Sequence, residues 1–442
     1  MAYTPQSSNG NANIIAPPGP VQDEAVAQGL GSGVDASHPR SAQTEAWQRQ
    51  SDHAVAANRG IDIGPAQKSE VAPSDPIELP KPLGSFELDA NVIAAFPDAG
   101  AKPIHAAKFG KSLWGTTAKI LVELPDGKCR NYFIKVVSNG ETGRLMCTGE
   151  FESLKAIHAT IPGFCPEPYA HGAYANDPGT HFMLVEFRDI GAQPAEPRKL
   201  AAGLAELHKQ SRSPTGKFGF HMRTCHTQID QAVDFWDDSW CAVYSSHLTH
   251  VIDLAKPVLR WPEFNVVADL TLSRVVPRLL LPLQAEGRTL KPSLVHGDCW
   301  DGNTAIDART GEAFIFDVCS FYAHNEYDTG NWRAPRHRLS NPAYIRYYKK
   351  SIPPSEPVED WDARNILYSL PFNVGNTLYV PGSTQRQIIY EDMTTLCKLF
   401  CPDELERGLN ELGKGTASNS GGLSGLADSE DDEAEEEEEE ED

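Results

Sequence analysis

One short stretch constrains the fold of this 442-residue chain more than any other part. It reads Leu-Val-His-Gly-Asp-Cys-Trp-Asp-Gly-Asn over residues 294–303, and Phe-Ile-Phe-Asp follows at 314–317. Phosphoryl transfer from a nucleotide needs a carboxylate that orients the attacking hydroxyl, together with oxygen ligands for magnesium. The pattern predicts Asp298 as the catalytic residue, and Asn303 and Asp317 as the metal ligands.

A plain surface turn is the alternative explanation of this stretch, because Asp, Gly and Asn dominate turns. The spacing of Asp298 and Asn303 equals that of the protein-kinase catalytic loop, but Gly297 stands where that loop has Arg, and no Asp-Phe-Gly follows Phe316. The protein-kinase label therefore fits poorly. The turn explanation requires the whole run, Asp317 and the upstream partners to coincide by accident.

A lysine in an apolar strand supplies the first upstream partner. Residues 117–124 and 131–137 are rich in β-formers and are separated by Pro-Asp-Gly-Lys, so they predict a hairpin. Lys135 has apolar neighbours on both sides, and in kinases such a lysine meets a nucleotide phosphate and a helix glutamate. The predicted helix over 143–160 offers Glu150, with Glu152 as its competitor. The alternative for Lys135 is an edge-strand charge that reaches water.

Two further segments suit a nucleotide site. Gly110 and Gly115 lie in a loop over 108–116 that could cover phosphates, although they could equally be turn glycines. A P-loop is excluded because position 105 is His where that motif needs Gly. The apolar strand over 181–187 predicts a hinge in which backbone groups of Glu186 and Phe187 bind the adenine edge. An ordinary core strand is the alternative.

Composition predicts a core flanked by unstructured ends. Residues 1–80 are polar and lack apolar periodicity, which predicts disorder. A Gly/Ser-rich stretch begins at 413 and leads into residues 428–442, of which 13 are acidic. This block predicts a solvated tail, with contact to a basic protein as the alternative. Removing it changes the net charge from -22 to -9, which still argues against nucleic-acid binding.

The sequence predicts neither a membrane-spanning segment nor disulfide bonds. No run of 18 apolar residues occurs, and the first residues lack the pattern of a secretory signal, so we expect a soluble, cytoplasmic protein. Nine cysteines without a Cys-x-x-Cys pair argue against disulfides and a zinc site. Cys299, inside the predicted catalytic turn, is a candidate for oxidation.

Several motifs together resemble the fructosamine (ketosamine) 3-kinases, a family of the aminoglycoside-phosphotransferase type. The likeness covers about residues 100–400 and is strongest in the run from His296 to Asn303. The other matching stretches are Gly-Glu-Phe-Glu-Ser-Leu at 149–154, Gly-Lys-Phe-Gly-Phe-His at 216–221, Phe-Trp-Asp-Asp-Ser-Trp at 235–240, and 320–328.

The resemblance implies an α+β, two-lobed protein-kinase-like fold. We expect a small antiparallel-sheet lobe over 85–187 and a larger helical lobe over 188–412. The implied activity is ATP- and Mg²⁺-dependent phosphorylation of the 3-hydroxyl of a ketosamine, free or on protein lysines, as a step of deglycation. Substrate contacts are expected from Trp236, Trp300 and His324, with a buried aromatic cluster as the alternative for Trp236 and Trp240. His208 is expected to pack, and the alternating His324, Glu326 and Asp328 to form structural hydrogen bonds rather than a metal site.

The likeness weakens after Asp328. Residues 329–338 carry three arginines and a proline where the family has an apolar segment, so the acceptor pocket is expected to differ in shape and charge, and a phosphorylated or acidic acceptor becomes conceivable. Two alternatives stay open for the function.

One is a kinase for another small alcohol, such as choline or an aminoglycoside. The other is a catalytically silent binding protein of the same fold.

Overall fold

The computed structural model describes residues 79, 82–110, 112, 114–379 and 385–420. All of them belong to one contact unit, residues 47–442. The predicted N-terminal tail, apart from Leu79, and the acidic block at 428–442 lie outside the described residues. The expected disorder of these ends and the contact with a basic protein therefore stay predictions.

The N-terminal lobe is built on a six-stranded antiparallel sheet with the order β1-β2-β3-β4-β6-β5. The predicted hairpin is confirmed, because Thr117 of β3 pairs with Lys135 of β4. The sheet begins at Pro82, slightly before the predicted start at 85. Its strands are β1 (Pro82–Ser85), β2 (Lys102–Phe109), β3 (Thr116–Glu123), β4 (Cys129–Ser138), β5 (Pro168–Ala173) and β6 (Thr180–Glu186).

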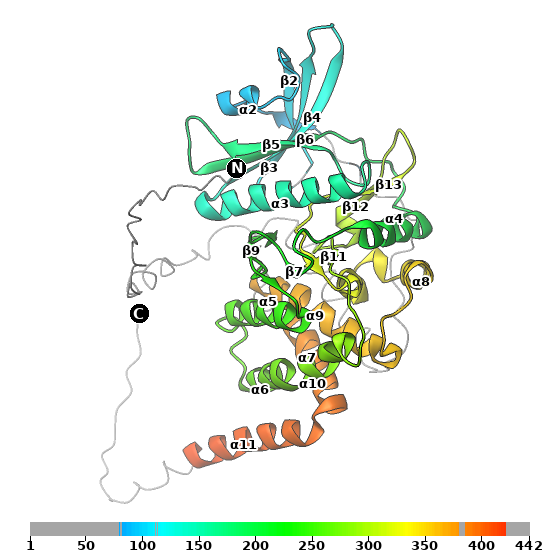
Figure 1. Ribbon diagram of the computed structural model, residues 1–442. Coiled ribbons are helices and arrows are strands. Elements are labelled where there is room, and N and C mark those ends of the chain that lie inside the picture. Colours follow the sequence, from blue (N-terminus) through cyan, green and yellow to red (C-terminus); the bar gives the residue numbers. More distant parts are fainter. Residues whose placement is uncertain (1–78, 80–81, 111, 113, 380–384, 421–442) are drawn as a thin grey trace, which may run out of the picture. The chain divides into compact units, whose positions relative to one another are not determined.

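Helices cover both faces of this sheet, and side chains alternate between the faces along each strand. Tyr132, Ile134 and Val136 of β4 pack in one cluster with Val92 of the short helix α2 (Ala90–Ala94). Val137 packs in the other cluster with α3 (Gly140–Thr160), which runs beneath the sheet in Figure 1. Lys135 alternates onto the same face as Val137, towards α3.

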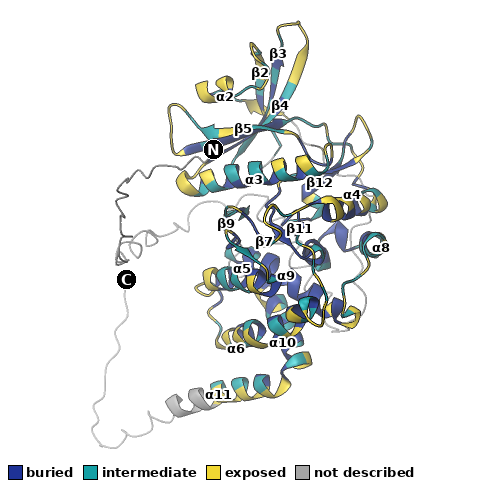
Figure 2. Ribbon diagram, viewed as in Figure 1, coloured by how far each residue is buried: buried dark blue, intermediate teal, exposed yellow. Residues whose placement is uncertain are grey.

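The C-terminal lobe is mainly helical, and the predicted helix at 200–208 is confirmed as part of α4 (Pro197–Gln210). Figure 2 shows that the segments packed together at the centre of this lobe are the most buried. Its other helices are α5 (Trp240–Ala255), α6 (Pro262–Leu270), η1 (Thr271–Val275), α7 (Val276–Leu280), η2 (Leu281–Gln284), η4 (Asn325–Arg333), η5 (Arg338–Ser340), α8 (Pro342–Ser351), η6 (Val358–Asp360), α9 (Trp361–Tyr379), α10 (Gln385–Phe400) and α11 (Pro402–Ser420).

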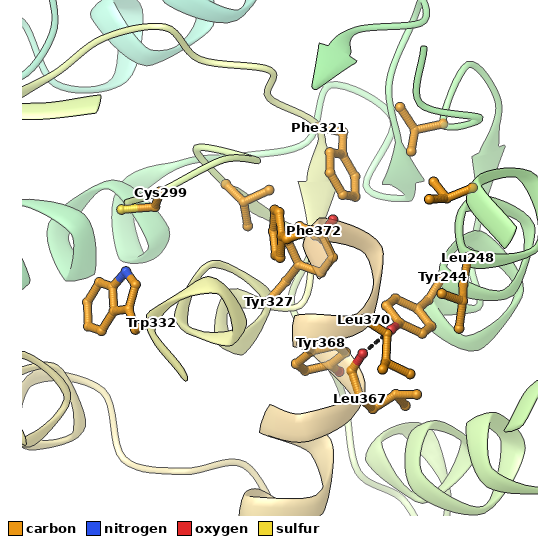
Figure 3. Packing of buried hydrophobic residues seen from close by; sticks show 14 of the residues in the cluster. Tyr244, Leu248, Cys299, Phe321, Tyr327, Trp332, Leu367, Tyr368, Leu370 and Phe372 are labelled. Carbon is orange, nitrogen blue, oxygen red and sulfur yellow. Dashed lines mark hydrogen bonds between the residues drawn. The ribbon is translucent and has the colours of Figure 1, made fainter. Parts of the chain in front are cut away.

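An aromatic core joins α5, η4 and α9. Tyr244, Tyr327 and Tyr368 pack with ring centroids 5.4 to 6.4 Å apart, and the Tyr244 hydroxyl donates to the Leu367 carbonyl at 2.5 Å (Figure 3). Trp240 is fully buried in the same core and donates its Nε1–H to Tyr368. The aromatic-cluster alternative for Trp240 is therefore confirmed.

Short strands hold the turn that carries Asp298 within the helical lobe. One four-stranded sheet has the order β10-β7-β14-β11, and two hairpins are formed by β12 with β13 and by β8 with β9. The strands are β7 (Phe218–Gly219), β8 (Cys225–His226), β9 (Ile229–Asp230), β10 (Trp236–Asp237), β11 (Ser293–Leu294), β12 (Thr304–Ile306), β13 (Ala313–Ile315) and β14 (Tyr322–Ala323), with the single turn η3 (Asp301–Asn303) between β11 and β12.

The predicted two-lobed α+β fold is thus confirmed, with one difference at its C-terminal boundary. Helix α11 continues to Ser420, past residue 412 where the Gly/Ser-rich stretch was expected to end the lobe. Glycine lowers helix propensity by about 1 kcal/mol per residue without forbidding extension of a helix that is already nucleated. Among the described residues, no helix is long and apolar enough to cross a membrane.

Candidate active site

Lys135 lies in the interior of the N-terminal sheet. Its strand, β4, is paired on both sides with β3 and β6, so the edge-strand alternative is excluded. The side chain is buried, and its Nζ lies 2.7 Å from Oε2 of Glu150 and 2.5 Å from Oδ1 of Asp317. One ammonium group therefore joins the sheet, helix α3 and the segment after β13.

Glu150, rather than Glu152, is the carboxylate that α3 presents to the sheet. The buried residues of α3 recur at helical spacing, and Glu150 falls among them together with Met146 and Ile157. Glu152 lies off this stripe and pairs with Lys155 at 3.2 Å. The predicted ion pair of Lys135 with Glu150 is confirmed.

The predicted catalytic turn, residues 295–303, is called the catalytic turn below. Its backbone is fixed by β11 and by the segment after β13. The Val295 N–H donates to the Phe321 carbonyl, and the Cys319 N–H donates to the His296 carbonyl. Gly297 has a φ of +89°, and a Cβ at this position would lie 2.1 Å from the Cys319 carbonyl oxygen. A glycine is therefore required where the turn crosses residue 319.

The Asp328 carboxylate holds the same turn by accepting two of its backbone N–H groups. Its Oδ2 accepts from the His296 N–H at 2.8 Å and its Oδ1 from the Gly297 N–H at 3.0 Å. The Nε2 of His208 lies 3.0 Å from Oδ2, and the other ring nitrogen contacts the Tyr348 hydroxyl. His208 thus packs structurally, as predicted.

Three side chains surround the Asp298 carboxylate. The amide of Asn303 donates to Oδ2 at 3.1 Å and that of Asn331 donates to Oδ1 at 3.0 Å. The Nε2 of His226, from β8, lies 3.4 Å from Oδ1. Asn303 also reaches the Asp317 carbonyl at 3.4 Å. The predicted trio of Asp298, Asn303 and Asp317 is therefore brought together in space.

Burial and neighbouring charges shift the pKa values of three residues at the site. Burial acts to lower the pKa of Lys135, but Asp317 and Glu150 outweigh it and raise that pKa well above its usual value. Burial acts to raise the pKa of Asp317, but Lys135, together with His296 and His226, lowers it overall. Burial acts to lower the pKa of His226, and the adjacent Asp298 raises it overall. The site favours charged forms of Lys135 and Asp317.

A cavity opens between the lobes at these residues. It is lined by Lys135 and Glu150 from the N-terminal lobe and by Asp298 and Asp317 from the C-terminal lobe. The remaining lining residues are Trp114, Met146, Cys225, Thr227, Val318 and Cys319. Half of the Asp317 side chain remains exposed despite its contact with Lys135, so carboxylate oxygen is available to a ligand in this cavity.

The glycine loop follows β2 and lies beside the cavity. Gly110 has a φ of +79°, and a Cβ on Gly115 would lie 2.3 Å from the Val136 carbonyl oxygen on β4. Trp114, in the same loop, lines the cavity next to Lys135. These positions agree with a phosphate-covering loop, and contacts of Gly110 and Gly115 with nucleotide stay a prediction.

The predicted hinge connects β6 to the C-terminal lobe. The Glu186 N–H already donates to the Glu167 carbonyl at 2.8 Å, so in this conformation it is not available to an adenine edge. The Phe187 ring contacts Phe109 at the end of β2, and the Lys119 Nζ lies 4.0 Å from its centroid. The hinge prediction therefore depends on the remaining backbone groups of Glu186 and Phe187.

The three residues expected to contact substrate lie in different surroundings. Trp236 is half-buried against Tyr322, and Trp300 packs on Gly302 and on His337, with ring centroids of the latter pair 5.1 Å apart. None of the three lines the cavity, so substrate contacts of Trp236 and Trp300 stay a prediction. His324 lies within the core. It is fully buried, and its ring nitrogens bond to the hydroxyls of Tyr368 and Ser355.

Sequence reasoning missed His226 and Asn331 as partners of the catalytic turn, whereas the structural hydrogen bonding expected of Asp328 is confirmed. His226 lies about 70 residues before Asp298 in a two-residue strand, and no local pattern indicates it. Asn331 stands in the segment that departs from the family pattern, and that departure was the available signal. Cys299 is fully buried, which raises its pKa well above the usual value and disfavours the reactive thiolate.

The chain is similar in sequence to a known family of kinases. Residues 107–390, 284 of the 442, match the model of the fructosamine kinase family. A chloroplastic protein-ribulosamine 3-kinase of Oryza sativa subsp. japonica is 30% identical over 242 residues, which cover 54% of this chain and 65% of the relative. A ketosamine-3-kinase of Mus musculus is 29% identical over 225 residues, covering 44% and 67%. The chain thus spans just under two thirds of the rice relative's length.

A solved structure supports the fold. A crystal structure described as a fructosamine-3-kinase from Thermobifida fusca aligns with a TM-score of 0.55 and 16% identity, covering 71% of this chain and 100% of the other. At that identity the likeness speaks for the fold alone. The family match covers well over half of the sequence and includes Lys135, Glu150, Asp298, Asn303 and Asp317, so this chain belongs to the fructosamine kinase family.

Proposed function

We propose that this protein transfers the γ-phosphate of ATP to the 3-hydroxyl of a ketosamine, free or attached to a protein lysine. The observation that carries the proposal is the contact of Lys135 with both Glu150 and Asp317 at the cavity that also contains Asp298. The relatives named as ribulosamine and ketosamine 3-kinases support the choice of acceptor. Phosphorylation at this position would serve deglycation.

Nucleotide phosphates would lie at the Lys135 end of the cavity. The Lys135 ammonium is held charged by two carboxylates, and Glu150 fixes its direction. A cation positioned in this way stabilises the charge on the transferring phosphoryl group. Gly110 and Gly115 would let the loop approach the phosphates closely, and backbone groups at Glu186 and Phe187 would bind the adenine.

The oxygen atoms that the C-terminal lobe offers at the site fit magnesium. Asp317 offers a half-exposed carboxylate and Asn303 an amide oxygen, and hard oxygen ligands are those that Mg²⁺ prefers. When bound there, the ion would neutralise phosphate charge. Asn303 also donates to Asp298, so the residue that would hold the metal orients the residue that would meet the substrate.

Asp298 would accept a hydrogen bond from the acceptor hydroxyl and take its proton as the phosphoryl group arrives. Asn303 and Asn331 hold its two carboxylate oxygens, which fixes the direction from which a hydroxyl approaches. Trp236 and Trp300 do not line the cavity, and their proposed stacking on a sugar follows from the family resemblance alone. His324 enters no step.

The test is to incubate the purified protein with ATP, magnesium and a glycated-lysine model compound and to measure the mass of the product. We expect one added phosphoryl group, lost in Asp298→Ala and retained in the control Asp253→Ala, whose side chain is exposed on α5. Turnover of choline or an aminoglycoside without turnover of a ketosamine would replace this acceptor by another alcohol. An inactive wild-type protein that still binds ATP would favour the silent binding protein.

A further inference from the structure

An arginine that is partly exposed but has two buried N–H groups without a hydrogen-bond partner lies on a segment attached to the catalytic turn. The Nε and Nη2 atoms of Arg336 are inaccessible to solvent and make no hydrogen bond. A guanidinium loses its hydration on burial, and structures normally compensate for this with a carboxylate, a phosphate or carbonyl oxygens. These two N–H groups therefore lack an acceptor, such as an oxyanion, among the described residues.

The segment that carries Arg336 is attached to the catalytic turn on both sides of it. Before Arg336, the Asn331 amide donates to Oδ1 of Asp298 at 3.0 Å. After it, the Arg338 N–H donates to Oδ1 of Asp301 at 2.8 Å. These two contacts hold the intervening residues against the turn that orients the acceptor hydroxyl.

Nearby charges act on Arg336 without compensating its burial. Burial lowers its pKa to about 10, while Asp301 and then Asp298 act in the opposite direction. The segment that carries Arg336 contacts Asp298 and Asp301, whereas Lys135 contacts Asp317. We therefore assign Arg336 to the end of the site where Asp298 would meet the acceptor, rather than to the end where Lys135 would meet the triphosphate.

We propose that Arg336 binds an anionic group carried by the phosphate acceptor, next to the hydroxyl that Asp298 orients. The group is an oxyanion, either a phosphate on the sugar or a carboxylate on the amine part, because the planar guanidinium donates two parallel hydrogen bonds to such groups. This inference rests on the proposed kinase function and narrows its acceptor to an acidic ketosamine.

The test compares three ketosamines that share one linkage. The first joins a neutral sugar to a neutral amine, the second carries a phosphate on the sugar, and the third carries a carboxylate on the amine part. Initial rates are measured for the wild type, Arg336→Met, Arg336→Lys and the control Arg346→Met, in which the altered arginine is exposed on α8.

We expect the wild type to prefer one of the two anionic acceptors. Arg336→Met should lower kcat/KM for that acceptor by roughly 30- to 100-fold, as expected for hydrogen bonds between charged groups, with the neutral acceptor and the KM for ATP little changed. Arg336→Lys should retain part of the preference. The acceptor that is preferred identifies whether the sugar phosphate or the carboxylate is the source of the oxyanion.

The thermal midpoint supplies a second readout. Two buried N–H groups of a cation that lack an acceptor do not stabilise the ligand-free fold, so Arg336→Met should unfold at the same temperature as the wild type or higher. A clearly lower midpoint would indicate a structural role and would overturn the assignment, as would equal use of neutral and anionic acceptors. A rise in the KM for ATP with every acceptor would move Arg336 to the nucleotide phosphates.

These outcomes separate the two proposals. Turnover of all three acceptors without regard to charge overturns the role of Arg336 and leaves the kinase function intact. Absence of turnover with any of them, while ATP is still bound, overturns both proposals.

Discussion

The Nε2 of His226 lies 3.4 Å from Oδ1 of Asp298 and joins the β8 hairpin to the catalytic turn. Burial lowers the pKa of His226, but Asp298 raises it overall above the ordinary value of 6.5, with Asp317 acting in the same direction and Arg336 against it. The folded protein therefore binds the His226 proton more tightly than the unfolded chain does. The stabilisation is complete below pH 6.5 and is lost as the pH rises through the folded-state pKa.

His226→Gln should therefore lower the free energy of unfolding more at acidic than at alkaline pH. We expect a loss of about 1.5 kcal/mol at about pH 6 and a smaller loss at about pH 9, measured by urea unfolding. The control is His105→Gln, an exposed residue of β2. A loss that is the same at both pH values would show that the imidazolium does not pair with Asp298.

Lys135→Met should lower the rate of phosphate transfer by at least about a hundredfold, because the cation that would stabilise the transferring phosphate is removed. It should also destabilise the fold by about 3 kcal/mol, since Glu150 is left buried without its partner. Adding Glu150→Gln should restore stability without restoring activity. Initial rates and urea unfolding check both effects, with the exposed Lys155→Met as the control. Recovery of activity in the double variant would contradict the role of Lys135.

Local sequence patterns predicted the parts of the site that depend on local structure. Strand and helix periodicity placed Lys135 in an apolar strand and Glu150 in a helix. Their pairing at a nucleotide site followed from the family resemblance, and Asp298 with Asn303 followed from the spacing of the motif. The edge-or-centre position of β4 was not predictable, since it depends on β6, which joins the sheet from more than 40 residues away.

The long-range partners escaped prediction for the same reason. His226 and Asn331 reach the catalytic turn through tertiary packing of separate segments, and no spacing in the chain encodes those contacts. His324 fits the pattern of a polar residue near the site, yet its hydrogen bonds to Tyr368 and Ser355 keep it within the core. Motif membership indicates that a residue is near the site and leaves open the direction in which it points.

Asp328→Ala should be strongly destabilising, because the buried carboxylate accepts two backbone N–H groups of the catalytic turn and contacts His208. Its removal leaves these donors unsatisfied, and we expect a loss of about 3 kcal/mol or more in the free energy of unfolding. Urea unfolding measures the loss, and Asp253→Ala on the exposed side of α5 is the control. A loss below about 1 kcal/mol would show that the turn does not depend on this anchor.

Gly297→Ala tests whether close backbone contact, beyond the positive φ, shapes the catalytic turn. Gly297 and Gly311 have similar φ values, +89° and +71°, so an added methyl group strains both positions. At Gly311 the new Cβ meets open space, whereas at Gly297 it would lie 2.1 Å from the Cys319 carbonyl oxygen. Gly311→Ala should therefore cost about 1 kcal/mol and retain activity, while Gly297→Ala should cost more and displace Asp298. Equal stability and equal rates in the two variants would show that the approach of residues 297 and 319 is not needed for the turn.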